Sequence, residues 1–77
     1  MGRYYFDLHR DGGVVADEDG AEFPNIEDAR DECAHILAEL AKWEMPGTSN
    51  WELMIVVKCD GKAVLTTRLL YQAGVPS

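Results

Sequence analysis

The sequence predicts an α+β fold, in which a mostly antiparallel β-sheet carries a single α-helix packed on one face. Three observations lead to this prediction. Residues 25–44 repeat apolar side chains at helical spacing, residues 3–9 alternate between the two faces of a strand, and two long apolar runs flank Asp60-Gly61. The expected order of elements is β-β-(β)-α-β-β. We expect a single domain over residues 1–77, with residues 72–77 as a flexible tail.

The first strand is predicted over residues 3–9, where Tyr4, Phe6 and Leu8 share one face and are expected to meet the helix. Two turns follow, at residues 11–13 and 17–20. Each turn leads into a short predicted strand, at residues 14–16 and 21–23 respectively. In the second turn, Gly20 is expected to supply the positive φ that such turns use.

The helix is predicted from Asn25 to about Glu44. Asn25 is a good N-cap because its side chain can accept a hydrogen bond from the first turn, and Asp28 stands three residues later. Met45-Pro46-Gly47 ends the helix, since the residue before proline is pushed out of helical conformation. The apolar residues form one stripe, which comprises Ile26, Ala29, Cys33, Ile36, Leu37 and Leu40. A one-sided stripe of this kind must lie on a sheet.

The last two strands are predicted to form a hairpin around Asp60-Gly61. A three-residue loop, with Gly61 as a bulge, pairs Lys58 with Lys62 and keeps the apolar side chains on a common face. A two-residue loop would set Leu53 opposite Arg68 and mix apolar with charged positions. The three-residue loop is therefore the predicted one.

Alternation along these strands separates two sheet faces. One face is expected to lie under the helix, and it includes Trp51, Leu53, Ile55, Val57, Leu65 and Leu69. The other face is more apolar than a solvated sheet face usually is, and a single helix leaves it uncovered. Its candidate interface residues are Tyr5, Met54, Val56, Val64, Thr66 and Leu70. We therefore expect a homo-oligomer or another protein partner, most simply a homodimer through this face.

Composition excludes several functions. The net charge of -7 and the scattered basic residues argue against binding nucleic acid or an anionic membrane, because phosphate is bound by Lys and Arg. No apolar run is long enough to span a bilayer, and the chain starts without a signal peptide. Two cysteines in this setting favour free thiols and a cytoplasmic location.

Few residues suggest chemistry. The acidic run Asp17, Glu18, Asp19 and Glu22 offers oxygens to a cation but lacks the spacing of a calcium loop, so cation binding stays open. His9 and His35 have no metal-ligand spacing, and both are expected on the surface. Cys33 fits the helix core, and Cys59 lies beside the last turn. The two tryptophans flank the loop after the helix, where they line a small pocket or pack at an edge. We predict no catalytic, cofactor or metal residue, and no enzyme activity.

The pattern resembles a family of short bacterial proteins, mostly alphaproteobacterial, that is classed as a domain of unknown function. The likeness covers nearly the whole chain. It is carried by the opening Arg3-Tyr4-Tyr5-Phe6-Asp7, by Asp17-Glu18 with Gly20, Glu22 and Pro24, by Ala29-Arg30, and by the turn at Asp60-Gly61. The resemblance implies a compact α+β fold and supplies no catalytic residue.

A weaker resemblance is to antitoxins of the HicB type, which also open with a Tyr-rich strand, a short β-meander and a similar helix. Here Glu22-Phe23-Pro24 precedes Ile26-Glu27-Asp28-Ala29, and the Pro-Gly-Cys turn of that family is absent. The resemblance implies a binder that masks a basic partner. The expected function is thus an acidic, non-enzymatic interaction module, with an antitoxin-like binder and a small metal- or ligand-binding protein as alternatives.

Overall fold

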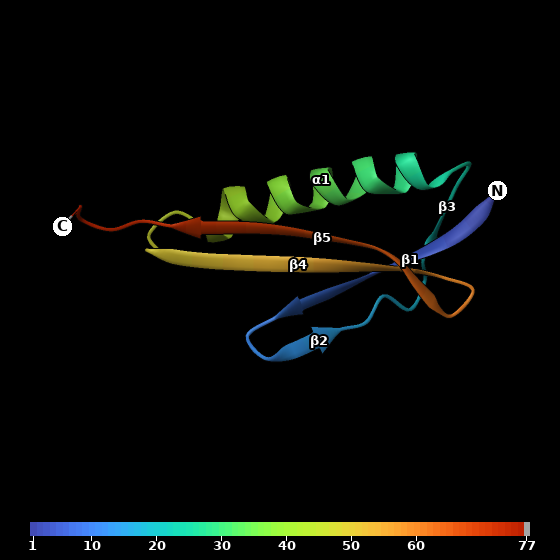
Figure 1. Cartoon of the computed structure of the whole chain (residues 1–77), viewed down its shortest axis with the longest axis horizontal. Coiled ribbons are helices and arrows are strands. Elements are labelled where there is room, and N and C mark those ends of the chain that lie inside the picture. Colours follow the sequence, from blue (N-terminus) through green and yellow to red (C-terminus); the bar gives the residue numbers. More distant parts are fainter. Residues whose placement is uncertain (77) are drawn as a thin grey trace.

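The computed structural model describes residues 1–76, in which one helix lies across one face of a five-stranded antiparallel sheet (Figure 1). The predicted α+β architecture is confirmed. The elements are β1 (Gly2–Arg10), β2 (Gly13–Val15), β3 (Ala21–Phe23), α1 (Ile26–Glu44), β4 (Asn50–Cys59) and β5 (Lys62–Gln72).

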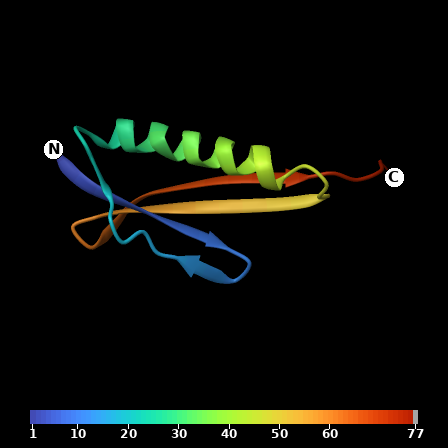
Figure 2. The same cartoon turned by 180° about the vertical axis from the view of Figure 1, so that it is seen from behind.

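The strands are ordered β2-β1-β4-β5, with β3 also paired to β1. Both short strands lie on the same edge of β1, since β2 pairs with its last residues and β3 with its first. The other edge of β1 pairs with β4. The loop from β2 to β3 runs past the middle of β1 along the edge that pairs with these two short strands, and Figure 2 shows the segment from behind.

The predicted loop of the β4–β5 hairpin is wrong. Cys59 pairs with Lys62, so that Asp60 and Gly61 alone form the turn, both with positive φ as a type I′ turn requires. A β-bulge then leaves Val64 without a partner and sets Val57 opposite Leu65. The bulge shifts the register by one residue, which restores the separation of apolar and polar faces. The bulge therefore allows a two-residue type I′ turn together with separate apolar and polar sheet faces. Without the bulge, this turn would mix apolar and charged side chains on each face.

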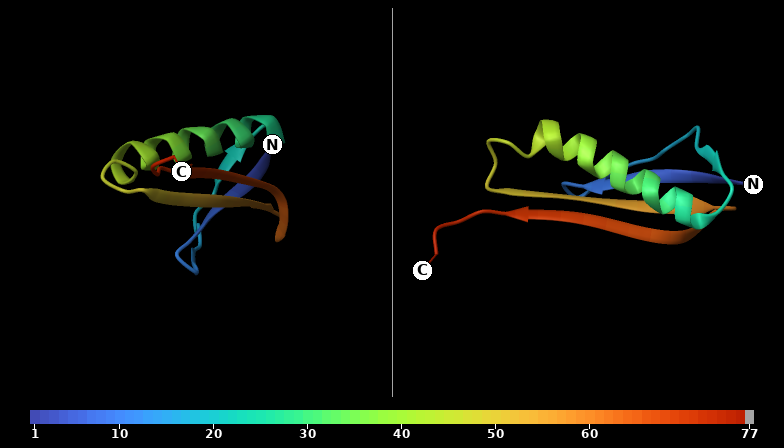
Figure 3. Two further views of the ribbon diagram at one scale, coloured as in Figure 1. Left: turned by 60° about the vertical axis from the view of Figure 1, so that its left-hand side comes forward. Right: turned by 90° about the horizontal axis from the view of Figure 1, so that it is seen from above.

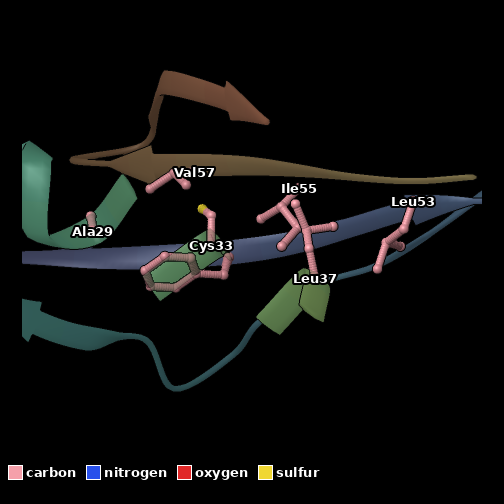
Figure 4. Close-up of a cluster of buried hydrophobic side chains, with 7 residues drawn as sticks. Ala29, Cys33, Leu37, Leu53, Ile55 and Val57 are labelled. Carbon is pink, nitrogen blue, oxygen red and sulfur yellow. The ribbon is translucent and has the colours of Figure 1, made fainter. Parts of the chain in front are cut away.

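The helix begins and ends as predicted. Asn25 is the N-cap, and its side chain accepts a hydrogen bond from the backbone N–H of Asp28 at 2.9 Å. The core lies between α1 and the sheet, and Figure 4 shows side chains from both layers meeting there. Its buried members are Phe6, Ala29, Cys33, Leu37, Leu53, Ile55 and Val57. Ile55 is fully buried under the helix, so the two sheet faces are oriented as predicted.

The first residues of the predicted tail are still hydrogen-bonded to the sheet. Gln72 pairs with Asn50, and the N–H of Ala73 donates to the carbonyl of Ser49 at 2.8 Å. Residues 73–76 are exposed and irregular, and Ser77 lies outside the described residues. The flexibility expected for residues 72–77 stays a prediction.

Candidate functional site

Five of the six predicted interface residues lie on the sheet face that α1 leaves uncovered, and the sixth, Val64, is the bulged residue of β5. Val64 and Leu70 are 45% and 50% exposed, and Thr66 between them is exposed as well. Met54 and Val56 are half-buried among their neighbours. Among the six predicted residues, Tyr5, Met54, Val56, Val64, Thr66 and Leu70, the most exposed apolar side chains are therefore the two on β5, Val64 and Leu70.

Tyr5 differs from the other five. A Cβ atom on Gly20 would lie only 2.9 Å from the Tyr5 ring, which shows that the loop before β3 covers this ring closely. Gly20 also has a φ of +69°, where a residue without a side chain is favoured. Tyr5 is therefore part of the packing between this loop and β1.

Ion pairs interrupt the apolar side chains of the uncovered face. Arg68 lies 3.4 Å from Glu52, and the Lys58 ammonium lies 3.0 Å from Asp7. Asp7 is only 4% exposed. The charged groups therefore divide this face into apolar regions near Val64 and Leu70.

An open groove of about 840 Å³ lies at one end of the sheet, where β4 and β5 extend past the end of β1. Its lining residues include His9, Trp51, Met54 and Leu70. Glu44, at the end of α1, accepts hydrogen bonds here from Arg10 and from the Trp51 indole. The end of the helix is thereby fixed to the ends of β1 and β4.

A carboxylate fills the gap between β2 and β3 on the edge of β1. The Asp17 side chain accepts hydrogen bonds from the backbone N–H groups of Phe6, Asp19 and Gly20, at 3.1, 3.2 and 3.1 Å. Its own N–H donates to the Asp7 carboxylate at 3.0 Å. Asp17 thus replaces a strand neighbour at the position where neither short strand reaches β1.

The two carboxylates are held ionised by their donors. Burial raises the pKa of Asp17, but the N–H groups of Phe6, Gly20 and Asp19 together outweigh it and lower the pKa below 3.8. For Asp7, the N–H of Asp17 is the largest cause of a lowered pKa, and Lys58 adds to it against the effect of burial.

The acidic run is divided between different partners. Both oxygens of Asp17 face backbone donors, and Glu22 lies 3.4 Å from Arg3. Among residues 1–76, no group of three His, Cys, Asp or Glu side chains is arranged to hold a metal ion. Cation binding by Asp17 or Glu22 would therefore have to displace contacts within the protein.

The histidines and tryptophans do not form one site. His35 is exposed on the outer side of α1, whereas His9 is half-buried and lines the groove. Trp43 is 71% exposed and hydrogen-bonds to Glu39 at 3.2 Å, away from the groove that Trp51 lines. Of the two arrangements considered for the tryptophans, a shared pocket is not formed, because Trp43 does not line the groove with Trp51.

Cys33 is fully buried between α1 and β4, and its sulfur points towards the sheet (Figure 4). Burial raises the pKa of its thiol and outweighs the opposite effect of the neighbouring Thr67 hydroxyl. A thiolate is therefore disfavoured at this position. Cys59 is half-buried in the hairpin, and both cysteines are free.

A protein-family model described as "Domain of unknown function (DUF6894)" matches residues 3–70. The chain belongs to this family. The DUF6894 match includes the whole sheet up to Leu70, the helix and the Asp7–Asp17 contact. It confirms the predicted membership of a family of unknown function, and assigns no activity to the groove or to the uncovered face.

No curated protein and no solved structure matches the chain. Within residues 1–76, the structure contains no helix that combines the length and the apolar character needed to cross a membrane.

Sequence reasoning missed two groups of residues. The Asp7–Asp17–Lys58 contacts depend on a loop that crosses the edge of β1, and an acidic turn does not reveal which carboxylate points inward. The contacts of Glu44 depend on where the end of α1 meets β4. One signal was available in the sequence. Asp7 is a charged residue in the middle of the first strand, and a charged residue buried there needs a partner.

Proposed function

We propose that the chain is a non-enzymatic protein-interaction module that self-associates through the part of its sheet that α1 leaves uncovered. The exposed Val64 and Leu70 on β5 are the observation that carries this proposal. The apolar faces of a sheet must be covered, and its unpaired edges must be protected from other strands. Here one helix covers only one face. A second copy is the simplest cover, as expected for the face that carries Tyr5, Met54, Val56 and Thr66.

The distribution of charge supports a second copy. Residues 17–44 contain ten acidic and two basic side chains, whereas residues 50–72 contain two acidic and three basic ones. The negative charge therefore resides on the loop before α1 and on the helix itself, and the β4–β5 hairpin is close to neutral. Two copies can approach through this hairpin while their acidic surfaces remain in solvent.

The use of the reactive side chains supports a non-enzymatic role. Asp7, Asp17 and Glu44 are occupied by structural hydrogen bonds, and the Cys33 thiol is buried with a raised pKa. Each of these groups stabilises a junction between elements. The pKa values of Asp7 and Asp17 are lowered, whereas a general acid at neutral pH requires a raised pKa.

Sedimentation equilibrium from about 1 μM to about 1 mM tests self-association, a range that covers weak to moderate dimers. We expect a dimer whose dissociation constant falls as salt is raised, because salt screens the repulsion between the two acidic chains. A mass of one chain at every concentration and salt would refute the proposal.

The alternative of a binder that masks a basic partner is supported by the outer side of α1, which exposes Glu27, Asp28, Asp31 and Glu39. Co-purification with a basic protein encoded beside its gene would support it, and a chain that purifies alone from its native host would contradict it. A small ligand or metal would have the groove as its site, and elemental analysis and ligand-induced shifts in melting temperature test that.

A further inference from the structure

The outer edge of β5 is free along its whole length. β5 is the last strand of the sheet, and no other strand of residues 1–76 pairs with this edge (Figure 3). Exposed edges usually carry a proline, an inward charge or a covering loop, because their unpaired N–H and C=O groups attract other strands. β5 has no proline, and the charge of Arg68 is directed to Glu52 on its own sheet face. Only the bulge at Val64 interrupts it.

The free backbone groups belong to alternate residues. In an antiparallel ladder one residue in two bonds to a given neighbour, and the residues between them point the other way. Because the N–H of Ala73 donates to Ser49, the odd-numbered residues of β5 beyond the bulge face β4. The N–H and C=O groups of Thr66, Arg68 and Leu70 therefore point to the free edge.

We infer that two copies join antiparallel along this edge, about a two-fold axis at Thr67, to form one continuous sheet with both helices on the same face. The inference rests on the self-association proposed above and names the surface that the second copy occupies. It assigns the contact to the β5 edge, in place of the face-to-face contact expected from the sequence.

Charge and hydrophobicity select the register. Residues directly opposite each other across an antiparallel pair lie on the same face, so only registers that pair even with even positions are allowed. An axis at Arg68 would set two like charges opposite each other, which is destabilising. An axis at Thr67 sets Thr66 opposite Arg68 of the copy, and it places the bulged Val64 near Leu70 of the copy. The exposed apolar side chains of Val64 and Leu70 then become neighbours across the contact.

At the axis, Thr67 faces Thr67 of the copy as a non-hydrogen-bonded pair, in which side chains approach most closely. The Thr67 hydroxyl is already buried beside Cys33 in the isolated chain, so only the exposed part of this side chain meets the copy.

The helix leaves room for a second copy. Ala41 and Met45 line a small hollow with Tyr71, which places this flank of α1 on the β5 side. Ala34 and Ala38 continue the same flank, three and seven residues before Ala41, and both are exposed. Small side chains at these positions allow the neighbouring helix to approach at ordinary packing distance.

Two variants distinguish an edge contact from a face contact. Thr66→Pro removes an N–H that points to the free edge, and leaves the ladder with β4 intact. Met54→Lys, the matched control, places a charge on the uncovered face away from the edge. We expect Thr66→Pro to raise the dimer dissociation constant by about 100-fold or more, and Met54→Lys to change it little.

Sedimentation of the three proteins separates the outcomes. A dimer that persists in Thr66→Pro and is lost in Met54→Lys would overturn the edge inference while the proposed self-association stands. A monomeric wild-type chain would overturn both. Circular dichroism checks that Thr66→Pro is folded.

Hydrogen exchange of the wild-type chain provides a test that needs no variant. With an edge contact, the Thr66 and Arg68 amides exchange more slowly as protein concentration rises. If both amides exchange rapidly in a chain that sediments as a dimer, the copies do not pair along β5.

Discussion

Replacement of Asp17 by alanine should destabilise the domain far more than replacement of any other acid in the same turn. The Asp17 carboxylate accepts three backbone N–H groups, of which that of Phe6 belongs to a buried residue at 8% exposure. Water cannot easily reach this N–H once the loop closes over it. An unsatisfied buried donor costs about 1–3 kcal/mol, and loss of the two turn hydrogen bonds adds about 1 kcal/mol.

The expected loss in free energy of unfolding for Asp17→Ala is therefore about 3 kcal/mol. For a domain of this length that corresponds to a melting temperature lower by about 12–24 °C, and it is a large part of a total stability of about 4–11 kcal/mol. Urea denaturation followed by tryptophan fluorescence measures the difference directly. Protein concentration should be matched between variants, because self-association adds to apparent stability.

Glu18→Ala is the matched control, since Glu18 is an exposed acid in the same turn. It should change the free energy of unfolding by less than about 0.5 kcal/mol. If Asp17→Ala and Glu18→Ala are equally stable, the carboxylate does not replace a strand neighbour of β1, and our account of this edge is wrong.

Two further predictions concern the same loop. The pKa values of Asp7 and Asp17 are lower in the folded chain than their ordinary 3.8, so the stability that they contribute is present above that value and is lost as pH falls through the folded pKa values. Urea titrations between about pH 2 and pH 6 should show this acid limb, and a double replacement by Asn should flatten it. Gly20→Ala should destabilise by about 2 kcal/mol or more, because the new Cβ adds a clash to the strain of a positive φ. Gly12→Ala, with a similar φ of +75° and no neighbour within 4 Å, should carry the strain alone, and equal melting temperatures of the two variants would contradict the clash.

Residue types predicted which sheet face the helix leaves uncovered. They did not predict which strand forms the free edge of the sheet. Alternation shows which side chains share a face, and it placed Val64, Thr66 and Leu70 together. Strand order is set by which strands meet in space, and only the structure makes β5 the outermost one. The free edge was therefore invisible in the sequence, although the residues that border it were not.

Local chemistry determined the helix, the turns and the two sheet faces, because a cap, a positive φ or a repeat of two acts over a few residues. Asn25 is an example, since its partner Asp28 lies three positions away, whereas the hairpin turn was located correctly at Asp60-Gly61 but predicted one residue too long. Contacts between distant segments decided the rest. The bulge at Val64 and the inward position of Asp17 depend on how a loop and two strands fit together. Those choices are settled by packing and by buried hydrogen bonds that exist only once the chain has folded.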